Sequence, residues 1–118
     1  MSQFYLADRF VQELGGTWRF CHVLGRWFEW DGLEWQERDK GKIQCLASEF
    51  LTRSIRWPEA SRLSMGMREQ ICTLYTTRAV LELVKCYPDV AATPEELGYA
   101  LPARTMRGAN WRRVKLKP

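Results

Sequence analysis

Several features on which enzyme sites depend are scarce in this sequence. It has a single histidine, His22, so any histidine-based nucleophilic device would depend on that residue alone. Cys21 directly precedes it, and neighbouring residues of a strand point to opposite faces, so the two cannot form a local dyad. Gly41-Lys42 has no glycine five residues earlier and is followed by Ile43 rather than Ser or Thr, which excludes a nucleotide-binding loop. We therefore expect a protein that is not an enzyme.

Paired metal ligands and long apolar runs are also missing. The four cysteines, Cys21, Cys45, Cys72 and Cys86, form no CxxC motif. They are typical of reduced, mostly buried thiols in a cytoplasmic protein. A zinc site would require these cysteines and His22, which are far apart in the sequence, to come together in the fold. No apolar run approaches the roughly 20 residues that span a bilayer, which excludes a membrane protein. We expect no metal or other cofactor, and no small-molecule substrate.

Charge is unevenly distributed along the chain. The net charge is +4, yet every charged residue from position 104 onward is basic, and the first 103 residues hold 12 basic and 14 acidic side chains. This predicts a single globular domain, 1–103, followed by a basic tail, 104–118, that could bind phosphate or an acidic protein surface. A solubilising tail without a specific partner is the alternative. The candidate nucleic-acid-binding residues are Arg104, Arg107, Trp111, Arg112, Arg113, Lys115 and Lys117.

The apolar pattern predicts an α+β fold. Apolar residues at helical spacing before Gly15-Gly16 indicate a helix over residues 2–14, and the β-forming stretch after them indicates a strand over 17–24. With the hairpin that follows, we expect a three-stranded antiparallel meander over residues 17–39. Two to four helices should then occupy 42–98, with one over 42–56, a long stretch that Thr76-Thr77 either continues or breaks, and a short helix beginning at Thr93-Pro94.

The segment RWFEWDGLEW, residues 26–35, contains three of the six tryptophans. Asp31-Gly32 is typical of a two-residue hairpin turn. That turn would place Glu29 opposite Glu34, and a preceding turn at Gly25-Arg26 would place His22 beside Glu29. Alternation then divides the hairpin into a face that covers the helices and a solvent-facing side. The expected covering residues are Phe28, Trp30, Leu33 and Trp35, and the expected solvent-facing residues are Trp27, Glu29, Glu34 and Gln36.

The order of these motifs resembles a known family. An LA-x-x-F helix, here residues 6–10, precedes a W-x-x-W-D-G-x-x-W hairpin over 27–35, and Pro94, Glu95 and Leu97 match a later segment. Over about 95 residues the chain is similar to the small domain that precedes the superfamily-three helicase in phage, plasmid and poxvirus primase-helicases. The family's primase and helicase centres lie in flanking domains, so the resemblance implies a stand-alone, non-catalytic relative that contacts nucleic acid or protein.

Two classes of function remain open. The first is a module of phage or mobile-element DNA replication that binds DNA or a nucleoprotein complex through the basic tail. The second is an inhibitor that blocks a host or phage helicase, or a CRISPR-like defence complex, by imitating nucleic acid with an acidic hairpin surface. The candidate protein-contact residues for this second class are Trp27, Glu29, Asp31, Glu34 and Glu37.

Overall fold

The first helix of the fold lies where the sequence predicts it. The computed structural model describes residues 1–101 and 111–114, and α1 spans Gln3–Leu14. The Ser2 hydroxyl caps it by accepting a hydrogen bond from the Tyr5 backbone N–H at 3.1 Å, because the first N–H groups of a helix have no internal partner. Gly15 ends it with φ of 59°, a left-handed conformation that glycine adopts without strain.

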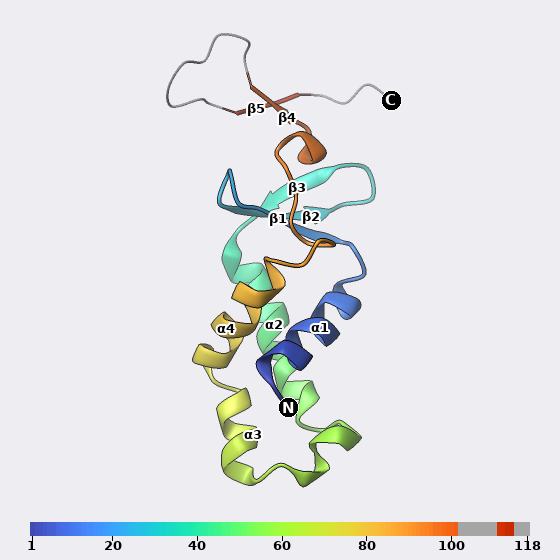
Figure 1. Ribbon diagram of the computed structural model, residues 1–118. Coiled ribbons are helices and arrows are strands. Elements are labelled where there is room, and N and C mark those ends of the chain that lie inside the picture. Colours follow the sequence, from blue (N-terminus) through green and yellow to red (C-terminus); the bar gives the residue numbers. More distant parts are fainter. Residues whose placement is uncertain (102–110, 115–118) are drawn as a thin grey trace.

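Three antiparallel strands follow, which confirms the predicted α+β class and meander (Figure 1). They are β1 (Trp18–Cys21), β2 (Arg26–Trp30) and β3 (Trp35–Arg38), in the order β1-β2-β3. The outer edge of β1 is covered by a distant segment. The Phe20 N–H donates to the Val90 carbonyl at 2.7 Å, and the Ala92 N–H donates to the Phe20 carbonyl at 2.9 Å. Residues 90–92 thus occupy the edge that β1 would otherwise leave unpaired.

The predicted register of the hairpin is wrong. The loop between β2 and β3 has four residues, 31–34, and Trp30 therefore pairs with Trp35 and Glu29 with Gln36. The Asp31 side chain explains the longer loop, because one of its carboxylate oxygens accepts from the backbone N–H groups of Leu33 and Glu34, each at 2.8 Å. This local capping by aspartate competes with the two-residue turn.

Four helical segments form the next part of the chain. They are α2 (Lys40–Ser54), the 3-10 helix η1 (Pro58–Arg62), α3 (Met65–Ile71) and α4 (Leu74–Val84). Helix α2 begins two residues before the predicted start because Asp39 caps it, accepting from the Gly41 N–H at 2.7 Å. The long helical stretch that the sequence predicts is broken, and Thr73 caps its second half.

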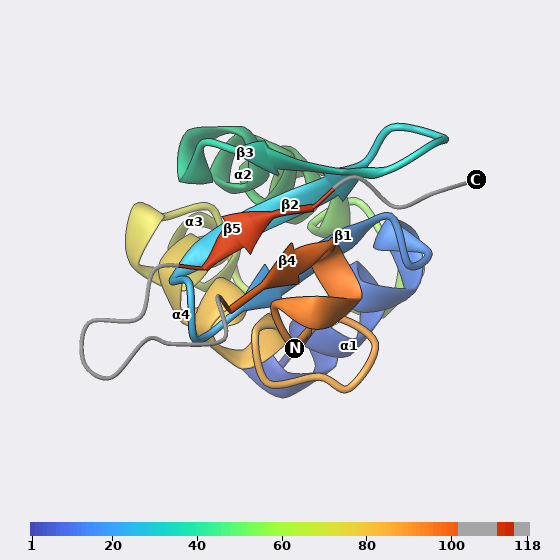
Figure 2. The same cartoon turned by 90° about the horizontal axis from the view of Figure 1, so that it is seen from above.

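The last described segments lie on the other side of the sheet from the helices (Figures 1 and 2). The short helix η2 (Glu95–Leu97) follows the predicted Thr93-Pro94 start, and β4 (Tyr99–Ala100) pairs antiparallel with β5 (Arg112–Arg113). We call the described residues 93–101 and 111–114 the cap. The sheet thus lies between a helical layer and the cap.

Each face of the sheet consequently has its own core. Trp18, Phe20 and Trp27 face α1, α2 and α4 and belong to the larger cluster, whereas Cys21 and Phe28 pack against Leu97 and Tyr99 of the cap. The predicted assignment of the hairpin faces is therefore reversed, since the supposedly solvent-facing side is the one that covers the helices. Two of the residues expected to cover them are in fact exposed, Trp30 at 41% and Leu33 at 87%.

Candidate functional site

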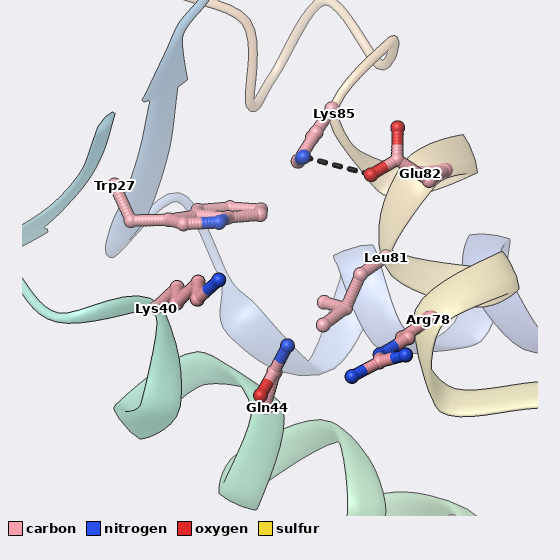
Figure 3. A pocket seen from close by; sticks show the side chains of 7 residues that line it. All are labelled: Trp27, Lys40, Gln44, Arg78, Leu81, Glu82 and Lys85. Atoms are coloured by element: carbon pink, nitrogen blue, oxygen red, sulfur yellow. Dashed lines mark hydrogen bonds and ion pairs between the residues drawn. The ribbon is translucent and has the colours of Figure 1, made fainter. Parts of the chain in front are cut away.

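A hollow of about 260 Å³ opens where β2, the start of α2 and the end of α4 meet (Figure 3). Its lining combines one indole ring, one apolar side chain, one amide, three cations and one carboxylate. We call it the β2–α2–α4 hollow. The lining residues are Trp27, Lys40, Gln44, Arg78, Leu81, Glu82 and Lys85.

Packing of the sheet on the helices fixes the wall of the hollow. Trp27 projects from β2 toward the helical layer and contacts Phe20 and Trp18, with ring centroids 5.0 and 6.3 Å apart. Its side chain is only 4% exposed, and Leu81 of α4 is 5% exposed. Trp27 therefore belongs to the core, and its predicted position on a solvent-facing side is wrong.

Helix geometry brings the cations together. Lys40 is the first residue of α2, and Gln44 lies one turn further along it. Arg78 and Glu82 are on α4, and Lys85 follows its last residue in a helical conformation, so spacings of four and three residues place all three on one face. In Figure 3 the ends of Lys40, Gln44 and Arg78 point into the same space beside the Trp27 ring.

Positive charge is in excess at this hollow. The Lys85 ammonium pairs with Glu82 at 2.8 Å and lies 4.5 Å from the centre of the Phe20 ring. Lys40 and Arg78 are exposed and form no ion pair within the part of the chain that the structure describes. Three cations thus oppose one carboxylate, which favours an anionic ligand.

A second hollow adjoins the first and shares Trp27 and Lys40 with it. Its other lining residues include Arg26 and Arg38, together with Glu37 and Asp39. Arg26 pairs with Glu37 at 3.5 Å, and Asp39 caps α2. Positive charge is therefore largely compensated in this second hollow, and it offers less attraction to an anion than the first.

The predicted acidic surface of the hairpin is not brought together as one patch. Glu29 lies on the helical side of the sheet, where its carboxylate accepts from Lys42 at 2.6 Å and Arg38 at 3.0 Å. Burial alone would raise the pKa of Glu29, but the hydrogen bonds and the positive charges of Lys42 and Arg38 together outweigh it, and the pKa is lowered. Glu37 lies on the opposite face and Glu34 in the loop, where it lies 3.7 Å from Arg113.

Asp31 is likewise engaged within its own loop. Hydrogen bonds from the backbone N–H groups of Glu34 and Leu33, and from the side chain of Gln36, lower the pKa of this carboxyl. All four carboxylates of the predicted protein-contact set therefore have partners inside the domain.

Only three of the predicted nucleic-acid-binding residues lie in the described part of the chain. Trp111 is partly buried against the cluster of the cap, and Arg112 is exposed on β5. Arg113 donates to the Trp35 carbonyl and lies over the Tyr99 ring, so its guanidinium stabilises the cap as well as being available to solvent. The other four, Arg104, Arg107, Lys115 and Lys117, lie outside the described residues.

The cations of the β2–α2–α4 hollow are not among the site residues that the sequence predicts. A signal for them exists in the stripe formed by Arg78, Leu81, Glu82 and Lys85, which recurs at helical spacing and carries charge beside an apolar position. The stripe does not show that α4 packs beside the start of α2, because the packing of two helices depends on the tertiary structure.

Histidine and cysteine take no part in this site. The ring of His22 is exposed and its Nε2 lies 3.0 Å from the Lys85 carbonyl, so the predicted neighbour Glu29 is wrong, because β1 ends at Cys21 and the turn comes earlier than expected. Three of the four cysteines are exposed, which corrects the expectation that most are buried. Among residues 1–101 and 111–114, no group of three or more ligating side chains is placed to bind a metal ion.

Comparison with known families assigns the domain. A family model described as "D5 N terminal like" matches residues 7–98, a span that contains the sheet, α2 to α4 and every residue of the hollow. Comparisons with curated proteins and with solved structures give no significant match. None of the helices that the structure describes is long and apolar enough to cross a membrane. The match covers well over half of the chain, which therefore belongs to the D5 N terminal like family, the accessory N-terminal domain of D5-like primase-helicases.

Proposed function

We propose that this domain is a non-catalytic module of phage or mobile-element replication that binds nucleic acid through the β2–α2–α4 hollow. The observation that carries the proposal is the convergence of Lys40, Arg78 and Lys85 on one hollow with a single carboxylate. Nucleic acid is the polyanion that a domain of primase-helicases would meet, and lysine and arginine at its phosphates supply most of non-specific affinity. Kinship with an accessory rather than a catalytic domain agrees with binding without turnover.

The basic tail extends this proposal. Deleting residues 104–118 removes the predicted tail contacts and also β5, which contains Arg112 and Arg113. If the tail supplies most of the affinity, this truncation weakens binding more than changes in the hollow do. If the hollow supplies it, the truncated chain keeps most of its affinity for DNA.

Inhibition of a helicase or defence complex through the acidic hairpin is the less supported alternative. An imitation of nucleic acid needs carboxylates that are free to attract a basic partner. Here Glu29 is shared between two cations, and Glu34 and Glu37 each have an arginine nearby. A tagged pull-down that recovered a stable protein complex, lost on charge reversal at Glu34 and Glu37, would favour this alternative.

The direct test of nucleic-acid binding measures the affinity of the full chain for a labelled single-stranded oligonucleotide across a salt series. We expect Lys40→Glu combined with Arg78→Glu to weaken binding at least about tenfold and to make the affinity less dependent on salt, because fewer counterions are released when fewer cations contact phosphate. Both side chains are exposed, so circular dichroism should show an unchanged fold.

The matched control reverses cations elsewhere on the domain. Arg62 at the end of η1 and Arg56 just after α2 are exposed, and they lie beyond the opposite end of a helix about 20 Å long, at 1.5 Å per residue. Reversing these two changes the net charge equally but should alter affinity much less. An affinity that falls equally in both double variants would mean that net charge rather than the hollow controls binding. If the full chain binds no oligonucleotide at low salt, the proposed function is wrong.

A further inference from the structure

The walls of the β2–α2–α4 hollow offer almost no surface on which a base could stack. Trp27 and Leu81 are at least 95% buried by their neighbours in the core, and base stacking needs an accessible aromatic face. What the hollow presents instead is the ends of its polar side chains (Figure 3). Its volume of about 260 Å³ is also below the range of about 300–1,000 Å³ that is usual for pockets binding larger organic ligands.

The cations of the hollow differ in how firmly they are held. The Lys85 side chain is 22% exposed, and its ammonium is fixed between Glu82 and the Phe20 ring. Lys40 and Arg78 are exposed and, among the described residues, unpaired. A fixed ammonium costs no ordering entropy when a ligand arrives, and the two free cations can adjust to the ligand's oxygens.

We infer that the β2–α2–α4 hollow is a phosphate subsite that holds one phosphate group between Lys40, Arg78 and Lys85, reads no base, and is kept below its maximum affinity by Glu82. This inference rests on the proposed function, to which it adds the chemical group that is recognised. Arg78 supplies the planar guanidinium that can donate two hydrogen bonds to phosphate oxygens, and the ammonium groups act as point charges. The Gln44 amide is placed to donate a further, neutral hydrogen bond.

The inference predicts that removing the charge of Glu82 has the opposite effect on affinity to removing one of the cations. Its side chain is 71% exposed and pairs with Lys85, so it places a negative charge at the rim of a site for an anion. Removing that charge should strengthen phosphate binding, whereas a role of Glu82 limited to stabilising α4 would not change the affinity at all.

The first experiment varies the ligand and uses the full chain. Three oligonucleotides of equal length are compared: an unmodified strand, an abasic strand that keeps its phosphates, and a methylphosphonate strand whose backbone is neutral. We expect the abasic strand to bind within about threefold of the unmodified one, and the neutral strand to lose about tenfold or more. Loss of binding by the abasic strand would overturn the inference, because recognition would then need the base.

Oligonucleotides can also distinguish a backbone phosphodiester from a terminal phosphate as the ligand. A strand with a 5′-terminal phosphate and one without it bind equally if the subsite takes a phosphodiester of the backbone. Stronger binding of the phosphorylated end, lost in Arg78→Gln, would instead identify a terminal phosphate as the ligand. Either result keeps the phosphate subsite.

The second experiment varies the protein. Glu82→Gln should raise the affinity for the unmodified strand about two- to fivefold, as expected for removing one repulsive, partly screened charge. Glu69→Gln is the matched control, because Glu69 is an exposed glutamate on α3 outside the hollow. An unchanged affinity in Glu82→Gln, or an equal rise in both variants, contradicts a role of Glu82 in the subsite.

Failure of the subsite and failure of the proposed function are distinguishable. If the unmodified strand binds but Lys40→Gln and Arg78→Gln bind equally well, the domain binds nucleic acid elsewhere and the subsite is wrong. If no strand binds, inorganic triphosphate is titrated and followed by NMR. Chemical-shift changes confined to the signals of Lys40, Gln44 and Arg78 would then support the phosphate subsite but not nucleic-acid binding. Absence of these changes would contradict both proposals.

Discussion

At the scale of single residues, Glu29 shows how a local pattern can mislead. Alternation placed this glutamate on a solvent-facing side, opposite a second glutamate, where it would destabilise the hairpin. The structure instead places its carboxylate between Lys42 and Arg38, with the side chain 23% exposed. The sequence could not show this arrangement, because Lys42 comes from the first turn of α2 and meets β2 only when that helix packs on the sheet.

Glu29→Gln tests this pair of ionic hydrogen bonds. The pKa of Glu29 is lowered from its ordinary value of 4.5, so its charged form stabilises the folded state above about pH 4.5, and this contribution is lost as the pH falls through the folded-state pKa. We expect the variant to lower the free energy of unfolding by about 1 kcal/mol near neutral pH. Urea unfolding as a function of pH should show the difference shrinking as the pH falls below about 4.5. A difference independent of pH would contradict the ionic origin.

At the scale of elements, helix positions follow closely from the sequence where a cap is readable. Ser2 and Gly15 set the bounds of α1, and the spacing of its apolar residues predicts which face is buried. The break between α3 and α4 was less accessible, because Thr73, Thr76 and Thr77 lie close together and each is a candidate cap. The Thr73 hydroxyl accepts from the Thr76 N–H at 3.2 Å, and the Thr76 hydroxyl is used instead to donate to the Gln70 carbonyl at 2.7 Å.

Substitution of Thr73 tests this assignment of the cap. Thr73→Ala should lower the free energy of unfolding by about 1 kcal/mol, because it leaves the first N–H groups of α4 without a side-chain acceptor. Thr73→Ser keeps the hydroxyl and should cost much less. Chemical denaturation of the two variants provides the measurement, and Thr52→Ala, at an exposed position within α2 where the hydroxyl caps no helix but donates to the Ser48 carbonyl, is the control for loss of a threonine outside a cap.

At the scale of the whole molecule, the order of elements was predictable and their layering was not. Turn residues and the spacing of apolar residues predict a helix, a meander and further helices, in the order that the structure shows. Neither feature reveals that the cap covers the second face of the sheet, since Leu97 and Tyr99 reach Phe28 across about 70 residues of chain. For the same reason the sequence does not predict the β2–α2–α4 hollow, which forms only where three elements meet.

Two aromatic residues on the cap-facing side of β2 test how far the cap covers that side of the sheet. Phe28 is fully buried, with its ring 5.8 Å from that of Tyr99, so Phe28→Ala should lower the free energy of unfolding by about 3–5 kcal/mol. Trp30 is 41% exposed and contacts Trp35, and Trp30→Ala should cost about 1 kcal/mol. Thermal unfolding provides the measurement, and equal losses in the two variants would contradict the burial of Phe28 beneath the cap.

The segment that covers the edge of β1 also constrains the order in which the domain folds. The guanidinium of Arg19 and the carbonyl of Ala91, which meet at that edge, are 72 positions apart, whereas β1, β2 and β3 pair through short turns. Local hairpins close quickly and distant contacts close slowly, so we expect the meander to form while its outer strand still exposes unpaired N–H and C=O groups. During synthesis from the N-terminus, we expect this strand to stay open until residues 90–92 are made, and in that interval its unpaired backbone groups can pair with a neighbouring chain.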